Sequence, residues 1–383
     1  MWPSGYSVAD VTKALTASQR KWSFRYELMD EWYQPKGEIK VIKCSVDYNA
    51  LATGPNRTAK FQIPSEEAGR INFYMDQIRA WARLKMPDGG YAEFPVGTFD
   101  VTTTGNRYIP KRRWSGGVSV SASEKDVLQI EGYDGIIRLQ QASLATRQEV
   151  NGGYVYTDAI RESIGYVNLI FTAIEHDPRT LPVDVEWAPG TSFLKQMTDL
   201  TDAINYEPLH IDSMGTATSR PYKAPEDASV LYSYAVDRKS VIIPGIDVEL
   251  DLFNIPNVFI ASVSEPDRLP LRSVFRNDDP NSVLSTVSRG RDITLVLDPG
   301  QGETNSAPDQ ASLDALVARA AQEASQQYEV VEFTTGLMPM HEHADVCMID
   351  YGEGPLRYRE TSWSMDLVAG GQMKHSMRRV VVL

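Results

Sequence analysis

Short runs of alternating apolar and polar residues dominate the first 150 positions. Every second side chain is apolar or aromatic in residues 21–28 and again in residues 42–48. Because successive side chains of a strand point to opposite faces, this period of two predicts strands with one buried face. Further strand-like runs, separated by turn residues, are found at 61–63, 78–84, 91–101, 118–122 and 127–139. Many short strands without a long helix predict an antiparallel barrel or sandwich.

A short helix is predicted ahead of these strands, from Ser7 to Ala17. Ser7 is a favourable N-cap, and Asp10 three residues later completes the pattern of a capping box, in which the two side chains satisfy free backbone N–H groups. Val11 and Leu15 would lie on one side of this helix as part of a narrow apolar stripe.

The pattern changes near residue 152, where apolar residues begin to recur three or four positions apart. This spacing predicts helices at 156–166 and 192–206, the second preceded by residues suited to an N-cap. A strand is predicted at 209–212, directly after the proline that ends the second helix. The middle of the chain is therefore expected to mix helices and strands.

The last third of the chain returns to strand-like runs around one strong helix. Residues 248–263 and 293–297 are predicted to be strands, with a turn-rich segment of Pro, Asn and Gly between them. The helix is predicted from Asp309 to Gln327, with apolar residues on one face only, so it should pack on one side. Strands are then predicted at 329–334, 344–350, 356–367 and 377–382.

The charge of the chain limits its relation to nucleic acid. Its 38 basic and 51 acidic residues give a net charge of −13, and no basic block is present. Binding driven by Lys and Arg on phosphates is therefore not expected. An acidic surface is instead compatible with a wall along which a duplex slides without sticking.

Cysteine content and hydropathy indicate a reducing compartment and no membrane span. Cys44 and Cys347 form neither a disulfide framework nor a CxxC metal motif, and both are expected to be small buried residues on strands. No apolar run approaches the roughly 18 to 20 residues that a membrane span needs. We expect a soluble protein that is assembled in a cytoplasm.

One cluster of residues has the composition of a metal site. His341 and His343, with Asp345 nearby, could bind zinc if a further ligand came from elsewhere in the fold. The segment lies between Pro339 and a predicted strand, and turns in such positions are usually polar. We therefore predict a solvated turn, and no metal ligand.

Other candidate residues give weaker signals. The acidic pairs Asp278-Asp279 and Asp184 with Glu186 are too close along the chain to flank a glycosidic bond from both sides. The basic segment Lys111–Trp114 is expected to contact a partner protein, because three charges give weak phosphate binding. Four tryptophans could form a sugar-binding platform, but burial in a core or an interface is the commoner fate of such side chains. They are Trp22, Trp32, Trp81 and Trp114.

Motifs in the last third of the chain occur in a distinctive order. Asn254–Asn257 (NIPN) lies within a strand-like run and is followed by a Pro-Leu pair at 270–271, by NDDPNS at 277–282 and by a Gly-Arg pair at 290–291. In residues 337–379 a turn is followed by an Asp at the start of a predicted strand, and a Gly-rich turn precedes a last strand that contains Arg. In this order the chain resembles the central hub proteins of phage tail tips and baseplates.

The resemblance implies a fold and an assembly. The fold would be mainly β with α+β insertions, and it would contain two tube-like antiparallel β-barrel domains and a small mixed α/β domain. The barrels would span residues 1–150 and 241–383, the second with the packed helix 309–327, and the mixed domain would span 151–240. Three chains would present six barrels, so a homotrimer could sit under a sixfold tail tube and offer threefold symmetry to a spike or fibre.

The resemblance also implies partners and a location. The distal tail protein, the tape-measure protein and a tail spike or fibre would be neighbours, and DNA would pass through a central channel without specific binding. The protein would belong to the virion tail tip after assembly in the host cytoplasm, without inserting into a membrane. It would be structural and not an enzyme, with no catalytic, cofactor-binding or metal-ligating residue. Because Leu383 directly follows the last hub strand, cell-wall degradation is expected on another protein.

Two other classes of function stay open at this point. The chain could be a tail-associated cell-wall hydrolase, in which His341, His343 and the acidic pairs would be the first residues to test. It could also be a receptor-binding or carbohydrate-binding tail protein. A zymogram on host cell wall would identify the first class, and host-cell adsorption by the isolated chain would identify the second.

Overall fold

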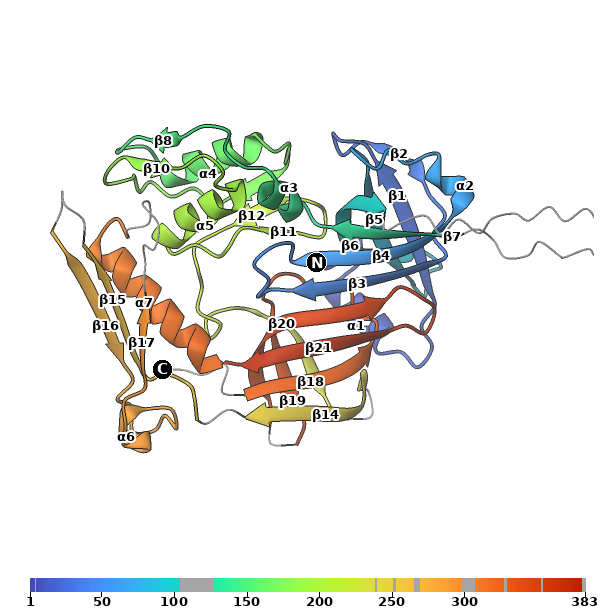
Figure 1. Cartoon of the computed structure of the whole chain (residues 1–383). Helices are drawn as coiled ribbons and strands as arrows, with labels where there is room; N and C mark the ends of the chain where they lie inside the picture. The colour runs from blue at the N-terminus through green and yellow to red at the C-terminus, as the bar shows by residue number, and fades with distance from the viewer. Residues whose placement is uncertain are drawn as a thin grey trace, which may run out of the picture.

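The computed structural model describes residues 1–3, 5–103, 127–237, 240–250, 253–264, 269–297, 307–326, 329–352 and 354–380. Strands predominate in these residues, so the prediction of a mainly β fold is confirmed. The predicted strand at 118–122 lies outside the described residues. Figure 1 shows one large sheet with a region of helices and short strands above it. A separate small sheet lies at the left, next to a long helix.

The large sheet contains strands from both ends of the chain. The N-terminal strands are β1 (Trp22–Met29), β2 (Pro35–Glu38), β3 (Lys43–Asn49), β4 (Arg57–Pro64), β5 (Gln77–Lys85), β6 (Tyr91–Thr103) and β7 (Val127–Tyr133). The C-terminal strands are β13 (Val230–Ala235), β14 (Ile242–Leu250), β18 (Glu329–Gly336), β19 (Val346–Asp350), β20 (Leu356–Asp366) and β21 (Gln372–Arg379). The main strand order is β14-β18-β21-β20-β3-β4-β7-β6-β5-β1-β2, and β19 joins β13 to β20.

The two sets of strands meet where β3 pairs with β20 in antiparallel register. Val46 is opposite Met365, and Tyr48 is opposite Trp363, whose rings stack with centroids 5.3 Å apart. Among the described strands the main pairing path runs open from β14 to β2, with β19 and β13 branching off at β20, so neither expected barrel closes by itself. The physical reason is that β3 and β20 satisfy each other's free backbone groups, which removes an edge from each set.

The N-terminal helix forms as predicted. α1 (Val8–Leu15) begins after Ser7, whose side chain accepts a hydrogen bond from the backbone N–H of Asp10 at 3.1 Å. Val11 and Leu15 are fully buried in the core of the large sheet. Both cysteines are also buried in this core, as expected from the sequence.

The middle region has an apolar core of its own, formed by residues between 136 and 217. Its helices are α3 (Ile136–Gln141), α4 (Tyr156–Gly165) and α5 (Phe193–Ala203). Its short strands are β8 (Gln148–Val150), β9 (Thr172–Ile174), β10 (Val185–Trp187), β11 (His210–Ile211) and β12 (Ala217–Ser219), arranged as the two small sheets β10-β8 and β11-β12-β9. The predicted helices and the strand after them are confirmed here.

A third apolar core lies between the long helix α7 (Gln310–Ser325) and a three-stranded sheet. The strands are β15 (Val258–Val263), β16 (Leu271–Arg276) and β17 (Thr294–Leu297), and the short helix α6 (Thr286–Arg289) precedes β17. Phe259 from β15 and Val317 from α7 are buried in this core. The helix therefore packs on β15 and β16. The domain boundaries expected at 150 and 240 stay predictions.

One further helix is short. The short helix α2 (Ser65–Ala68) follows β4 directly. Among the helices that the structure describes, none is both long enough and apolar enough to cross a membrane.

Shortening Met365 to alanine tests the seam between the two sets of strands. Met365 is 3% exposed and opposite Val46, so its truncation leaves a cavity. We expect the free energy of unfolding to fall by about 2–5 kcal/mol. Met75 is 46% exposed, and Met75→Ala should change this free energy by less than about 0.5 kcal/mol. Urea unfolding followed by tryptophan fluorescence measures the free energy of unfolding of both variants. If Met365→Ala lost as little of it as Met75→Ala, the packing of Met365 at the seam would be contradicted.

Candidate functional site

The segment 341–345, predicted to be a solvated turn, is a turn whose two histidines are buried. Ala344 adopts the left-handed conformation with φ of 54°, and β19 begins two residues later. His341 is only 2% exposed and His343 only 8%. The prediction of a solvated turn is therefore wrong. The polar groups of a turn usually form their hydrogen bonds with water. Here side chains from other parts of the chain take the place of that water.

His341 and His343 contact different partners, so the structure does not join them as two metal ligands. His343 Nδ1 lies 2.6 Å from the Tyr48 hydroxyl, and its ring stacks on His210 with centroids 3.9 Å apart. Burial lowers the pKa of both His343 and His210. Two neutral imidazoles can stack closely without charge repulsion, which explains this arrangement.

Glu342, between the two histidines, forms an ion pair with Arg57 from β4. Arg57 Nη2 donates to Glu342 Oε2 at 2.7 Å, and the Ser213 hydroxyl donates to Glu342 Oε1. Burial alone would raise the pKa of Glu342, but the Arg57 guanidinium, the Met1 ammonium group 3.5 Å away and the hydrogen bonds outweigh it and lower this pKa to about 2. The carboxylate is therefore ionised at neutral pH.

Arg57 has contacts in three parts of the chain, which are the N-terminal strands, the middle region and the C-terminal part. Its side chain is 1% exposed, and Nη1 donates to the carbonyl oxygen of Ile211 in the middle region at 3.2 Å. The guanidinium lies over the rings of Tyr48 and Trp363, 5.4 and 5.7 Å from their centroids. A buried guanidinium gains from aromatic faces as well as from its ion pair. We call this cluster, Arg57 with Glu342, Ser213, Tyr48 and Trp363, the central junction.

Asp134, directly after β7, supports the backbone beside the junction. Its carboxylate accepts from the backbone N–H of Arg57 at 2.7 Å and from that of Ile136 at 3.0 Å. Burial nevertheless raises the pKa of Asp134 to about 7, because those hydrogen bonds offset only part of the loss of hydration. The start of β4 is thus anchored by a carboxyl group that titrates near neutral pH.

A second polar cluster lies inside the C-terminal set of strands. His341, Glu360 from β20 and His375 from β21 are each at most 2% exposed, and one donor atom from each lies within 4.8 Å of the others. His375 Nδ1 is 2.6 Å from Glu360 Oε1, and His341 Nδ1 contacts Glu360 Oε2. Among the described residues this group has the composition and proximity to hold a metal ion.

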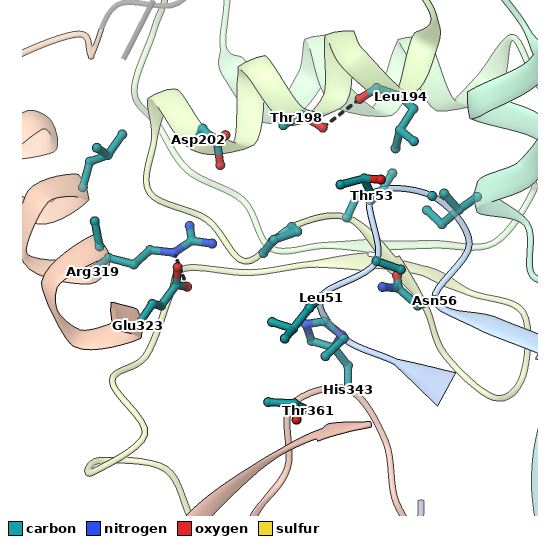
Figure 2. A pocket seen from close by; sticks show the side chains of 18 of the residues that line it. Leu51, Thr53, Asn56, Leu194, Thr198, Asp202, Arg319, Glu323, His343 and Thr361 are labelled. Carbon is teal, nitrogen blue, oxygen red and sulfur yellow. Dashed lines mark hydrogen bonds and ion pairs between the residues drawn. The ribbon is translucent and has the colours of Figure 1, made fainter. Parts of the chain in front are cut away.

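A cavity of about 800 Å³ lies where the three parts of the chain meet. Figure 2 shows Thr198 and Asp202 on α5 above it, Arg319 and Glu323 on α7 beside it, and His343 below. Arg319 Nε donates to Glu323 at 3.0 Å, so opposite charges in the lining pair locally. Such a lining lacks the single sign of charge that concentrates a charged ligand, which favours a packing junction over a substrate site.

The acidic pairs considered for hydrolysis are engaged in local contacts. Asp278 accepts from Arg276 Nε at 2.9 Å. Asp184 accepts from the backbone N–H of Gly152 at 2.7 Å, and Glu186 on β10 forms an ion pair with Arg147, directly before β8. These contacts hold turns and strand ends together, and they lend no support to a hydrolytic pair.

The tryptophans considered for sugar binding lie in different surroundings. Trp22 packs near Phe94 with ring centroids 6.1 Å apart, Trp81 lies under a guanidinium, and Trp32 is 56% exposed. Partial burial of the first two favours a packing role. The basic segment Lys111–Trp114, which contains the fourth tryptophan, lies outside the described residues.

Sequence reasoning missed Arg57, Glu360 and His375, although a signal existed for two of them. Arg57 has the same phase as the buried residues of β4, and His375 lies between two buried methionines at every second position of β21. A charged or titratable residue at an inward position of an alternating strand must find a partner inside the protein. That rule identifies both residues, but not their partners.

Exchange of Glu342 for glutamine tests the ion pair of the central junction. Glu342→Gln leaves the buried guanidinium of Arg57 without a counter-charge, so the free energy of unfolding should fall by about 3–5 kcal/mol. The double variant Arg57→Met with Glu342→Gln should recover part of this loss, because no unpaired charge remains. Arg70→Met, which removes a surface ion pair with Glu67, should change stability by at most about 1 kcal/mol. Losses that simply add in the double variant would contradict the pairing.

Exchange of Asp134 for asparagine tests its raised pKa. In the folded protein Asp134 stays protonated up to pH of about 7, whereas in the unfolded chain it ionises near 3.8. Its contribution to stability is therefore fully present below pH of about 4 and is lost as the pH rises through 7. Asp134→Asn removes this titration, so between pH 4 and 7 the variant should gain on the natural chain by about 1 kcal/mol per pH unit. Urea unfolding at several pH values measures the difference, and a constant difference would contradict the raised pKa.

Comparison with known proteins identifies relatives by structure only. No protein-family model and no curated protein sequence matches the chain. A tail protein from Neisseria meningitidis MC58 is 14% identical, with a TM-score of 0.60, and the match covers 93% of this chain and 97% of that one. The 43 kDa tail protein of prophage MuSo2 from Shewanella oneidensis is 10% identical, with a TM-score of 0.55 and coverage of 93% and 98%.

A third solved structure extends the likeness. The prophage tail protein gp18 from Listeria monocytogenes EGD-e is 10% identical, with a TM-score of 0.51 and coverage of 92% and 94%. At such low identity a structural match establishes the fold, and function needs its own argument. The resemblance to phage tail proteins that the sequence motifs indicated is thus confirmed for the fold: over almost its whole length, this chain has the fold of these three tail proteins.

Proposed function

We propose that this chain is a structural hub subunit of the tail tip or baseplate of a long-tailed phage. The observation that carries the proposal is the match to three tail proteins, which covers at least 92% of this chain and at least 94% of each of the three. Likeness over the whole length supports a common role better than likeness confined to one small domain, because small folds recur in many unrelated functions.

The architecture supports a role in symmetry matching. The N-terminal strands β1–β7 and the C-terminal strands β14 and β18–β21 form two sets that lie side by side in one sheet (Figure 1). A ring of three chains would present six such sets. Such a homotrimer would have nearly sixfold symmetry where it contacts a hexameric tail tube and true threefold symmetry where it contacts a spike or fibre.

The ends of the large sheet offer contacts for such a ring. Among the described strands, β2 and β14 each pair on one side only. β14 also exposes apolar side chains, with Val248 42% exposed and Leu250 53%. An unpaired edge with apolar side chains favours association with another strand, and a closed ring removes such edges. In our proposal, neighbouring subunits meet at β14 and β2.

The negative charge of the chain is compatible with the wall of a channel through which DNA passes. With a net charge of −13, three subunits would repel phosphates and allow a duplex to move without specific binding. In this proposal the distal tail protein lies above the ring, the tape-measure protein within it, and the spike or fibre below it. The subunit would assemble in the host cytoplasm, remain in the virion and catalyse no reaction.

Mass measurement and electron microscopy of the purified chain test this proposal. We expect particles of about three times the 42.8 kDa chain mass and rings with a nearly sixfold outline. Val248→Lys places a charge on the β14 edge and should shift the population towards monomers. Val8→Lys changes a residue of similar exposure on α1, 51%, and should leave the rings intact. A monomer at all concentrations, together with tail particles that lack the chain at their tip, would reject the proposal.

A further inference from the structure

The second polar cluster combines three potential metal ligands in a fully enclosed place. His341 comes from the turn before β19, Glu360 from β20 and His375 from β21, and none is more than 2% exposed. Their donor atoms lie within 4.8 Å of one another. Two imidazoles and a carboxylate form a ligand set that is common for zinc and related divalent ions.

The side chains around His375 hold its ring in one orientation. Thr335 Oγ1 donates to the carbonyl oxygen of Gly336 at 2.7 Å and lies 3.0 Å from His375 Nε2. With its proton on Gly336, this hydroxyl accepts from Nε2, and the lone pair of the neutral ring then lies on Nδ1, which is 2.6 Å from Glu360 Oε1. In this tautomer Nδ1 is free to bind a metal ion.

The other half of the cluster pairs two buried atoms. His341 Nδ1 and Glu360 Oε2 are in contact as an ion pair, and both are inaccessible to solvent. Apart from this contact, neither atom has a hydrogen-bond partner among the described residues. A metal ion bound by both atoms and by His375 Nδ1 would join the three ligand atoms at one centre.

The surroundings of the two rings match those of metal-binding histidines. Such histidines usually use their second nitrogen in a hydrogen bond that fixes the ring. His341 Nε2 is 2.6 Å from the Tyr234 hydroxyl, and His375 Nε2 faces Thr335. Phe333 stacks on His375 with ring centroids 4.8 Å apart, which excludes water from that side.

We propose that His341, Glu360 and His375 bind one divalent transition-metal ion, with zinc as the ion that suits the ligands best. The ion would link the turn before β19 to β20 and β21. Because the ligands are buried, with apolar and aromatic side chains around them, the site would be structural and would not expose the ion to a substrate. This site is separate from the central junction and does not depend on the proposed role in a phage tail.

Refolding of the full chain in the presence of metal tests the site. Unfolding exposes the ligands, so refolding with Zn²⁺ and removal of free metal should leave about one zinc per chain, measured by mass spectrometry of the elements. His375→Gln and Glu360→Gln should lose this zinc. His176→Gln removes an exposed histidine and should retain it. Zinc should also raise the melting temperature of the natural chain, because an ion that binds only the folded state stabilises it.

Several outcomes would overturn the proposal. If the refolded natural chain retains no zinc, hydrogen bonds alone hold His375, Glu360 and His341 together. If His375→Gln retains as much zinc as the natural chain, the ion binds elsewhere. Should both variants fail to fold, X-ray absorption of the natural chain loaded with Co²⁺ decides: nitrogen and oxygen ligands together support the site, and oxygen ligands alone reject it. If the chain forms rings but retains no zinc, only the metal site is rejected. If it retains zinc but stays monomeric, only the role in the phage tail is rejected.

Discussion

The buried contact between Arg57 and Glu342 is the interaction on which the arrangement of the three regions depends. A guanidinium that is 1% exposed is tolerated only with a counter-charge and further acceptors. Glu342 comes from the C-terminal half, and the second acceptor, the carbonyl oxygen of Ile211, comes from the middle region. The ion pair therefore defines one relative placement of all three parts, because other placements would leave a buried charge unpaired.

The large sheet imposes the same placement by a different physical route. β3 and β20 would each be an exposed edge if the two ends of the chain folded apart, and their pairing removes both edges. The Tyr48 and Trp363 rings that stack at this seam also lie under the Arg57 guanidinium. The sheet and the ion pair thus reinforce each other at one point. Among the described strands of the large sheet, β2, β13 and β14 pair on one side only.

Buried polar residues carry much of the specificity of this fold. His341 and His343 are only two positions apart, yet one belongs to the cluster with Glu360 and the other stacks on His210. Each contact needs one particular orientation of the turn that contains Ala344. Apolar packing tolerates alternatives, whereas such polar contacts do not, so they select one arrangement among several compact ones.

The amino-acid sequence by itself determined the local elements. Periodicity predicted most of the strands and the helices at 156–166, 192–206 and 309–327, and Ser7 predicted the cap of the first helix, because these features depend on neighbours along the chain. Periodicity was wrong at residues 136–139, which form part of α3, and it joined β14 and β15 into one strand. The order of motifs also pointed to the fold that the tail proteins share. Only the tertiary structure decided that β3 pairs with β20 and that the histidines of 341–343 are buried. Strand pairing and burial depend on residues some 300 positions apart, such as Arg57 and Glu342, and no local pattern encodes which of them meet.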